Sequence, residues 1–437
     1  MTESFKPSTK QKIVLLSYSL VWLLIIPFAV CHFVYQFVRR KPGYTRARLS
    51  RYGFTLKLEH HHNTLLIHCA SVGEVVAVQN LVEQLLVNDP KQRIMITTNT
   101  TTGADRVELL FADRVDHAYL PYDFPFFVKY FLKRKRPAKI LINEMELWPN
   151  LCDQCWRSGI PIFIINGRMS EKSSKTYLKY PSLFQPMFKK ITAICAQDQR
   201  DYQNYLTLGV PPEKLTLTNN IKFDLTISEH DIALSQTIKT NFALEHRLLL
   251  VAGSTHDPEE QILLDAYQAL VAIYPRLLLI IVPRHPQRFN KVRQLLQKQN
   301  IETILMSEAK LCQATTQVIL CDQMGKLRSI YALADISFVG GSLSNKGGHN
   351  ALEPAAVGVP ILMGGSTYNN PAICQALADS GALITVTDAF EIESACKKWI
   401  DNPEQKKFAG DAGRRVLAHN SGAIQKTLEV LNPSHFS

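Results

Sequence analysis

A single carboxylate stands at the end of an apolar run early in the chain. Residues 64–78 read TLLIHCASVGEVVAV, so Glu74 follows a strand-like run and a glycine and opens a helix-like run. Three interpretations are open: a favourable charge at a helix start, worth roughly 0.3–1 kcal/mol, a ligand contact, or a general base that deprotonates a hydroxyl. The helix dipole opposes a raised carboxyl pKa, so the base interpretation requires apolar surroundings.

Other strand-like runs in the first half also end in polar residues. TTNTTTG at 97–103 offers hydroxyls either to a phosphate or sugar, or to ordinary helix capping. NEMELWPNL carries Glu144 and Glu146 beside Trp and Pro, which suits a rigid loop facing a sugar, although one of the two can simply be solvated. NGRMS offers Arg168 to an anion.

The second half has its own candidate anion site. In IIVPRHPQRF, two prolines flank Arg284 and His285, so Arg284 is either a rigid phosphate ligand or a surface residue of a turn. DISFVGGSLSNKGGHNALEP runs from a strand through two pairs of glycines to a helix expected near 350–354. Backbone N–H groups at that helix start suit a phosphate, and Glu353 can accept both hydroxyls of a ribose. The run is neither G-x-G-x-x-G nor a P-loop, which argues against a hydride enzyme or an ATPase.

The length, composition and net charge of the chain restrict the class of protein. The 437 residues are 46% apolar, which fits two hydrophobic cores and argues against disorder. The net charge of +11 indicates an acidic partner: phosphate, carboxylate, an anionic membrane surface or nucleic acid. The nine cysteines are scattered, which suits a reducing compartment. CDQC at 152–155 has no second pair at zinc spacing, and EHHH at 59–62 is expected to be a solvated loop, so we predict no metal site.

An apolar segment near the amino end must be placed in or on a membrane. Residues 13–38 contain no Asp, Glu, Lys or Arg and are predicted to be a membrane helix kinked at Pro27. A signal peptide would be followed by small residues, but RRKPGYTRARLSR follows here. Its six Arg or Lys, against three Lys before the segment, place the bulk of the chain in the cytoplasm. This flank is expected to lie on anionic head groups, and a helix lying in the interface is the alternative to a spanning one.

Beyond residue 60, strand-like runs alternate with helix-length segments, the pattern of parallel sheets. The predicted strands are TLLIHCA, RIMITTN, AKILIN, PIFIIN and ITAICAQ in the first half, and RLLLVAG, LLLIIVP, TQVIL, DISFVG, PILMG and ALITVT in the second. We therefore predict an α/β protein with two doubly wound domains, 41–230 and 231–437, after an anchor at 1–40. Ligands of such folds bind at the carboxyl ends of the strands.

A nucleotide site, a sugar-facing loop and a membrane anchor together favour a glycosyltransferase. Its two domains would face each other across a cleft. We expect the acceptor on the first domain, with Glu146 and Arg168 on the sugar side, and the nucleotide-sugar on the second domain.

Seven motifs carry a resemblance to a known family. ASVGE, ELWPN, NGRMS, GSTH, PRHPQRF, ADISFVGGSL and GGHNALEPAA, in this order, resemble the Kdo (3-deoxy-D-manno-octulosonic acid) transferases of lipopolysaccharide synthesis. The resemblance covers nearly the whole chain, including the anchor and its basic flank. It implies a GT-B fold and inverting transfer of Kdo from CMP-Kdo to the 6′-hydroxyl of a tetraacylated lipid A precursor (lipid IVA). It also implies that the reaction takes place at the cytoplasmic face of the inner membrane.

The resemblance implies roles for individual residues. The Glu of the GE dipeptide, Glu74, would be the general base. The residues expected to hold CMP are Pro283, Arg284, Met324, Gly325, Lys326, Asn350, Ala351, Leu352 and Glu353. Lys326 stands where the family usually has Glu, which a backbone contact to CMP would survive and a side-chain contact would not. Ala351 replaces the usual Pro, and GGSTYNN at 364–370 departs from the family pattern and receives no role.

The expected partners follow from these roles. They are CMP-Kdo, the lipid A precursor and the anionic inner-membrane surface. Nucleic acid is not expected, because aromatics interleaved with the basic residues are sparse. CMP carries one phosphate and no D-x-D motif ends a strand, so we expect no metal and no cofactor. Two alternatives are a UDP-sugar epimerase, which shares this architecture without needing an anchor, and a non-enzymatic lipid- or nucleic-acid-binding protein.

Overall fold

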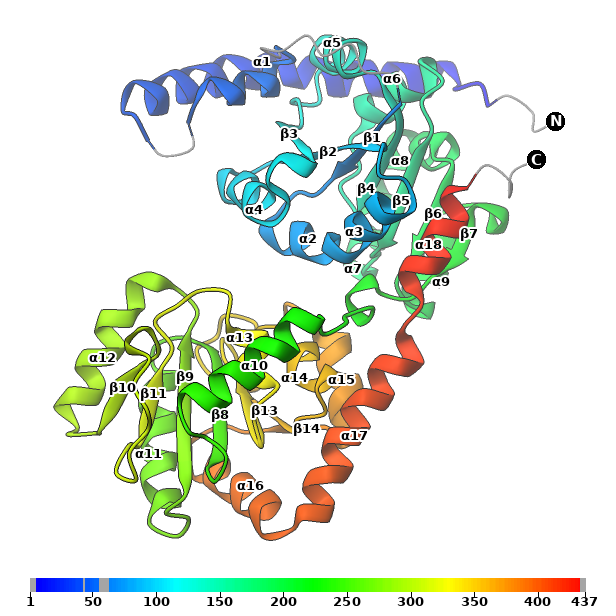
Figure 1. The fold of residues 1–437 in the computed structure, drawn as a ribbon. Helices are drawn as coiled ribbons and strands as arrows, with labels where there is room; N and C mark the ends of the chain where they lie inside the picture. The colour runs from blue at the N-terminus through cyan, green and yellow to red at the C-terminus, as the bar shows by residue number, and fades with distance from the viewer. Residues whose placement is uncertain (1–4, 42–43, 55–62, 433–437) are drawn as a thin grey trace. The chain divides into compact units, whose positions relative to one another are not determined.

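The computed structural model describes residues 5–41, 44–54 and 63–432. It divides into two compact units, one containing the chain up to Asp224 and from Ser421 onward, the other Leu225–Asn420 (Figure 1). Each unit has a seven-stranded sheet in which all recorded strand pairs are parallel. This confirms the predicted α/β architecture. The EHHH run at 59–62 lies outside the described residues.

The first unit has the strand order β3-β2-β1-β4-β5-β6-β7. Its strands are β1 (Thr64–His68), β2 (Arg93–Thr98), β3 (Asp116–Tyr119), β4 (Pro137–Asn143), β5 (Ile162–Gly167), β6 (Ala193–Ala196) and β7 (Leu215–Leu217). Its helices are α1 (Thr9–Val38), α2 (Val72–Ala77), α3 (Gln79–Asn88), α4 (Thr101–Phe111), α5 (Pro125–Lys135), α6 (Pro149–Arg157), α7 (Glu171–Lys179), α8 (Pro181–Lys190), α9 (Gln199–Thr207) and α18 (Ala423–Leu431). The order reverses between β1 and β4, so a ligand crevice is expected at their carboxyl ends.

The second unit has the strand order β10-β11-β9-β8-β12-β13-β14. Its strands are β8 (Leu248–Thr255), β9 (Leu277–Pro283), β10 (Thr303–Leu305), β11 (Val318–Leu320), β12 (Ile336–Val339), β13 (Ile361–Met363) and β14 (Leu383–Thr385). Its helices are α10 (Glu229–Asn241), α11 (Glu259–Val271), α12 (Phe289–Lys298), α13 (Leu327–Tyr331), α14 (Leu352–Ala356), α15 (Pro371–Asp379), α16 (Ala389–Asp401) and α17 (Pro403–Asn420). Here the order reverses between β8 and β12.

Three strands were not predicted: β3, β7 and β10. All three lie at the edge of a sheet. An edge strand pairs on one side only, so its residues are less uniformly buried and less apolar than those of a central strand. The sequences of these three strands, DHAY, LTL and TIL, are accordingly short and partly polar.

The C-terminal helix corrects the predicted domain limits. The prediction assigned 231–437 to the second domain, but α18 belongs to the first unit. Its apolar face, including Ile424 and Leu428, joins the core beside Ile67 of β1. The carboxylate of Asp224 accepts hydrogen bonds from the backbone N–H groups of Gly422 and Ile424, which fixes the start of the helix.

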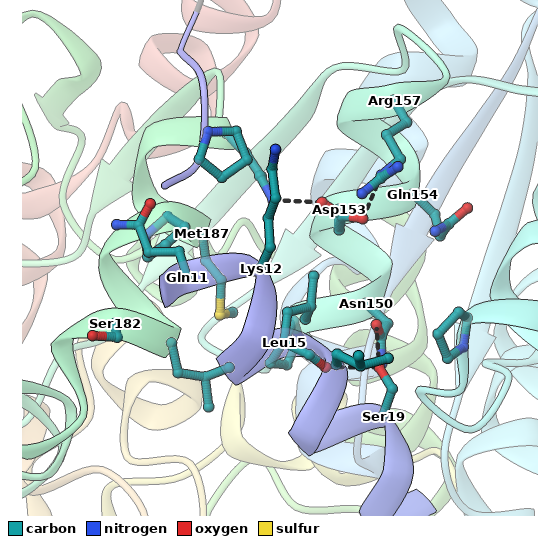
Figure 2. Close-up of a pocket in the computed structure, with 17 residues that line it drawn as sticks. Gln11, Lys12, Leu15, Ser19, Asn150, Asp153, Gln154, Arg157, Ser182 and Met187 are labelled. Carbon is teal, nitrogen blue, oxygen red and sulfur yellow. Dashed lines mark hydrogen bonds and ion pairs between the residues drawn. The ribbon is translucent and has the colours of Figure 1, made fainter. Parts of the chain in front are cut away.

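Helix α1 lies along the first unit rather than projecting from it (Figure 1). Tyr18 and Ser19 of α1 hydrogen-bond Asp123 and Asn150, the latter at 3.0 Å. Figure 2 shows Leu15 and Ser19 facing Asn150 and Met187 around a cavity of about 300 Å³. Toward the other end of the helix, the Tyr52 hydroxyl donates to the carbonyl of Ala29 at 2.8 Å. At 1.5 Å per residue, contacts from Leu15 to Ala29 span about 21 Å of the axis.

Candidate active site

The first unit presents Glu74 at the carboxyl end of β1. Ser71 caps α2, and its Oγ accepts a hydrogen bond from the Glu74 backbone N–H. The side chain of Glu74 folds back over this turn: Oε2 accepts from the Ala70 N–H at 3.0 Å, and Oε1 accepts from the Ser71 hydroxyl at 3.1 Å. The turn therefore fixes the orientation of the carboxylate.

Burial is the main influence on the proton affinity of Glu74. It raises the pKa to about 7, against the lowering effect of the two hydrogen bonds, and the nearby carboxylates Glu144 and Glu146 raise it further. The raised pKa is compatible with the base interpretation. A carboxyl group with a pKa near 7 can both accept and release a proton at neutral pH.

Glu146 lies in the loop that follows β4, and its pKa is shifted in the opposite direction. Its Oε2 accepts hydrogen bonds from His68 Nε2 at 3.0 Å, Asn99 Nδ2 at 2.6 Å and Trp148 Nε1 at 3.1 Å. Burial alone would raise the pKa of Glu146, but these hydrogen bonds and the His68 interaction outweigh it and lower the pKa. Two neighbouring carboxylates are thus differentiated, one suited to take a proton and the other to remain an anion.

The network around Glu146 includes residues that the sequence analysis missed. His68 contacts Thr97 Oγ1 through Nδ1 at 3.0 Å, so a tautomer protonated at Nε2 satisfies both contacts. Arg51 donates to Asn99 Oδ1 at 2.7 Å. The sequence did offer one signal: His68 is the one basic side chain inside TLLIHCA.

The structure places Arg51 and Glu144 in other surroundings than the sequence analysis predicted. Arg51, counted in the basic flank expected on lipid head groups, instead packs over the Tyr122 ring at 4.2 Å and faces the Glu146 network. Glu144 is not simply solvated, because Lys222 Nζ lies 3.5 Å from its Oε1. Lys222 was also missed by the sequence analysis.

Two threonines of the TTNTTTG run have contacts within the fold. Thr100 caps α4 by accepting from the Gly103 N–H at 3.1 Å, and Thr98 Oγ1 contacts His117 at 2.9 Å. Of the two open interpretations, capping is confirmed for Thr100. Arg168 follows β5 and lies near Asp201 of α9, where its charge lowers the pKa of that carboxyl against a larger effect of burial.

In the second unit, the predicted residues come together at the carboxyl ends of four neighbouring strands, β11, β9, β8 and β12. Pro283 ends β9, and the Arg284 N–H donates to the carbonyl of Thr255 at 3.1 Å, which ties β9 to β8. Met324 is exposed, Gly325 has a left-handed φ of 80°, and Lys326 stands at the N-cap position of α13 without a side-chain capping bond. Residues 324–326 are therefore accessible to a ligand at the carboxyl edge of the second sheet.

Glu353 lies at the start of α14 and has a cationic neighbour that the sequence analysis missed. Arg328 Nε of α13 lies 3.4 Å from Glu353 Oε1. Burial raises the pKa of Glu353, while Arg328 and Arg284 oppose the effect. Ala351 and Leu352 are almost completely buried, backbone included, whereas Asn350 is partly exposed.

The glycine-rich loop corrects the expected phosphate cradle. The N–H groups of Gly348 and His349 donate to the carbonyls of Gly341 and Gly340, and the Leu352 N–H donates to Asn350 Oδ1 at 3.2 Å. These donors are therefore already used within the loop. The glycines permit close packing instead: a Cβ on Gly340 would stand 2.4 Å from the carbonyl oxygen of Ser254.

Two doubly wound units, one with Glu74 and Glu146 at the β1–β4 switch point and the other with Arg284 and Arg328 beside Glu353, are typical of a glycosyltransferase of the two-sheet type. Family models agree with this class: residues 46–225 match the 3-deoxy-D-manno-octulosonic-acid transferase (kdotransferase) model, and 248–416 match glycosyl transferases group 1. A 3-deoxy-D-manno-octulosonic acid transferase of Haemophilus influenzae is 40% identical over 95% of this chain and 97% of its own length. The chain therefore belongs to the Kdo transferase family.

Two further comparisons are consistent with this assignment. A 3-deoxy-D-manno-octulosonic acid transferase of Bordetella pertussis is 28% identical over 84% of this chain and 86% of its own length. The crystal structure of UDP-GlcNAc 2-epimerase from Neisseria meningitidis superimposes with a TM-score of 0.58 over 84% of this chain and 99% of its own. At 14% identity, that likeness shows the shared two-domain GT-B-like fold alone.

Proposed function

We propose that this chain transfers Kdo from CMP-Kdo to the 6′-hydroxyl of a tetraacylated lipid A precursor, with inversion at the anomeric carbon. The observation that carries the proposal is the placement of Glu74 at the β1 switch point, held by Ala70 and Ser71 and with its pKa raised to about 7. Family membership supplies the sugar, and the lipid class of the acceptor is supported by the apolar helix α1.

The reaction requires one proton transfer and one exchange of bonds at C2 of Kdo. The acceptor oxygen forms a bond to C2 as its proton passes to Glu74, and the bond from C2 to the phosphate oxygen of CMP breaks. CMP leaves with the electron pair, and Arg284 neutralises charge on its phosphate. General-base assistance of this kind contributes about 10²–10⁴ in rate. Because the leaving group has one phosphate, no bridging divalent metal is assigned to the reaction.

The remaining site residues are assigned by chemistry. Glu146 keeps one oxygen for the hydroxyls of the acceptor sugar, because its recorded hydrogen bonds are all to Oε2. On the donor side, the guanidinium of Arg284 contacts the phosphate. The backbone of 324–326 and the partly exposed Asn350 line the nucleotide, and Glu353 accepts from the ribose. We keep Arg168 as a tentative anion contact for the acceptor.

Replacing Glu146 by Gln tests the acceptor assignment. The change keeps the shape but removes the charge that holds His68, Asn99 and Trp148, so we expect KM for the lipid acceptor to rise at least about tenfold, the loss of one charge-assisted hydrogen bond. CMP affinity should not change. Glu171→Gln, an exposed carboxylate paired with Lys175 at 3.8 Å, is the matched control. An unchanged acceptor KM in Glu146→Gln would contradict the assignment.

Nucleotide preference separates this proposal from the epimerase alternative. Calorimetric titration of the full-length protein should give a lower Kd for CMP than for UDP. Tighter binding of UDP would contradict the proposed donor, whatever the acceptor is.

We further propose that the protein sits at the cytoplasmic face of the inner membrane with α1 in the interface plane. Helix α1 is long and apolar enough to cross a membrane. Its contacts with the first unit nevertheless run from Leu15 to Phe33, which leaves no free stretch of about 20 residues to span the bilayer. Many of its apolar side chains, among them Leu16, Leu20, Leu24 and Phe28, are exposed and available to lipid.

The exposed face of α1 gives a direct test of this arrangement. Leu24 and Phe28 are 73% and 77% exposed, so burying them in lipid gains about 1.5–3 kcal/mol each. Leu24→Asp with Phe28→Asp should therefore weaken binding to anionic vesicles at least about tenfold in a flotation assay. Leu109→Asp on α4, equally exposed at 73%, is the control. Equal vesicle binding by both variants would rule out α1 as the contact.

A further inference from the structure

Three histidines cluster at the carboxyl edge of the second sheet, beside the residues assigned to CMP. His256 follows β8, His285 follows β9 and His349 lies in the loop after β12, so three neighbouring strands each supply one. The Nε2 atoms of His256 and His349 are 2.9 Å apart, and their rings stack at 5.1 Å with an interplanar angle of 11°. The His285 ring lies 5.4 Å from that of His256.

This geometry does not suit a metal ion. The described part of the chain contains no group of three or more His, Cys, Asp or Glu arranged to hold one. Two nitrogens bound to one zinc at about 2.0–2.1 Å in tetrahedral geometry would stand about 3.3 Å apart. The separation of 2.9 Å instead fits a hydrogen bond between two imidazoles.

The surroundings of the cluster are positively charged. The charges of Arg284, Arg288 and Lys346 all act on His256. Arg288 is paired with Glu260 at 2.8 Å, and the carboxylate of Glu259, which is fully buried, is already saturated. It accepts the backbone N–H groups of His256, Gly341, Ser342, Leu343 and Ser344. The cluster and Arg284 are therefore left with a surplus of donors and positive charge.

The two stacked histidines are neutral donors at physiological pH. Burial, followed by the neighbouring histidines and cations, lowers the pKa of His256 to about 4 and that of His349 to about 3. A neutral imidazole carries one N–H. The ring that accepts in the Nε2 pair must therefore carry its proton on Nδ1, where it can be donated to a ligand. The adjacent Thr255 Oγ1 is fully buried and has no hydrogen-bond partner among the described residues.

We propose that His256 and His349, next to Arg284, bind the carboxylate of the sugar donor. This assignment rests on the proposed function. In CMP-Kdo the carboxylate and the phosphate are attached to the same carbon, C2, so the groups that hold them must be adjacent. Arg284 holds the phosphate. The histidine that accepts in the Nε2 pair donates its Nδ1–H to the carboxylate, and the other histidine orients it through that pair. A nucleotide-activated aldose has no such carboxylate, so this subsite selects for a 2-keto acid sugar.

Comparing CMP with CMP-Kdo tests this subsite, because CMP lacks the sugar carboxylate. In full-length His256→Gln and His349→Gln we expect the Kd for CMP to stay within about twofold of the wild type. KM for freshly prepared CMP-Kdo should rise at least about tenfold, the loss of a hydrogen bond to a charged group. His246→Gln, an exposed histidine before β8, is the control. Retained CMP binding also shows that the variants are folded.

The remaining outcomes overturn the assignment in distinguishable ways. An unchanged KM for CMP-Kdo in both variants would show that these histidines do not hold the carboxylate. Equal losses for CMP and CMP-Kdo would assign them to the nucleotide or to the fold of the loop. If the wild-type protein does not bind CMP, the proposed function fails first and this subsite fails with it.

Discussion

Replacing Glu74 by Gln is expected to lower kcat for Kdo transfer at least about 10²-fold while leaving the fold and CMP affinity unchanged. Gln keeps a carbonyl oxygen that can accept from the Ala70 N–H, so the turn at the end of β1 is retained. It cannot take a proton from the acceptor hydroxyl. The measurement is kcat at saturating CMP-Kdo and acceptor. Glu83→Gln, a carboxylate of the same unit paired with Arg114 at 2.6 Å, should retain full activity.

The pH dependence of the same variant carries an independent signature. Because the pKa of Glu74 is about 7, the base is protonated and inactive below that pH, so wild-type kcat should fall as pH falls through 7. The residual kcat of Glu74→Gln should not show this fall with pH. A wild-type profile flat from pH 6 to 8 would show that another group removes the proton.

The raised pKa also affects stability with a definite sign. The folded pKa of Glu74 lies above its ordinary value of 4.5, so its stabilising contribution is complete below 4.5 and lost as pH rises through about 7. Gln does not titrate. The Tm of wild type relative to that of Glu74→Gln should therefore fall between these pH values.

The second large effect is expected at Arg284. Removing its side chain in Arg284→Ala deletes a charge-assisted contact to the CMP phosphate worth about 1.5–3 kcal/mol, so Kd for CMP should rise about 10- to 100-fold. The backbone bond from the Arg284 N–H to Thr255 remains, and the strand ends stay tied.

Two matched variants sharpen the Arg284 test. Arg284→Lys should recover part of the affinity, because Lys supplies the charge without the planar fork. Arg293→Ala, an exposed arginine on α12, should bind CMP normally. If Arg284→Ala binds CMP as tightly as wild type, the phosphate is held elsewhere.

Local sequence pattern predicted the position of Glu74, but not the network around Glu146. A strand, a glycine and a helix start are adjacent in the chain, so their geometry follows from short-range rules. Glu146 instead accepts hydrogen bonds from His68 at the end of β1, Asn99 after β2 and Trp148 after β4. Their meeting depends on which strands are neighbours, which no local pattern contains.

The same limit applies to α1 and to the histidine cluster. Residues 13–38 read as uniformly apolar, so the docking of Ser19 on Asn150 could not be distinguished from a lipid-facing helix. His256 and His349 are 93 positions apart and meet only because β8 and β12 pair in the sheet. The glycines around His349 predicted a phosphate cradle, whereas the structure uses them for close packing of the two strand ends.

Transfer of Kdo from freshly prepared CMP-Kdo to a tetraacylated lipid A precursor, with the products weighed by mass spectrometry, tests the central claim most directly. The account predicts an acceptor heavier by one or more Kdo units, with an equal amount of CMP released, and neither from Glu74→Gln on the same time scale. An acceptor of unchanged mass, from a protein that binds CMP and beside an active control enzyme, would contradict it.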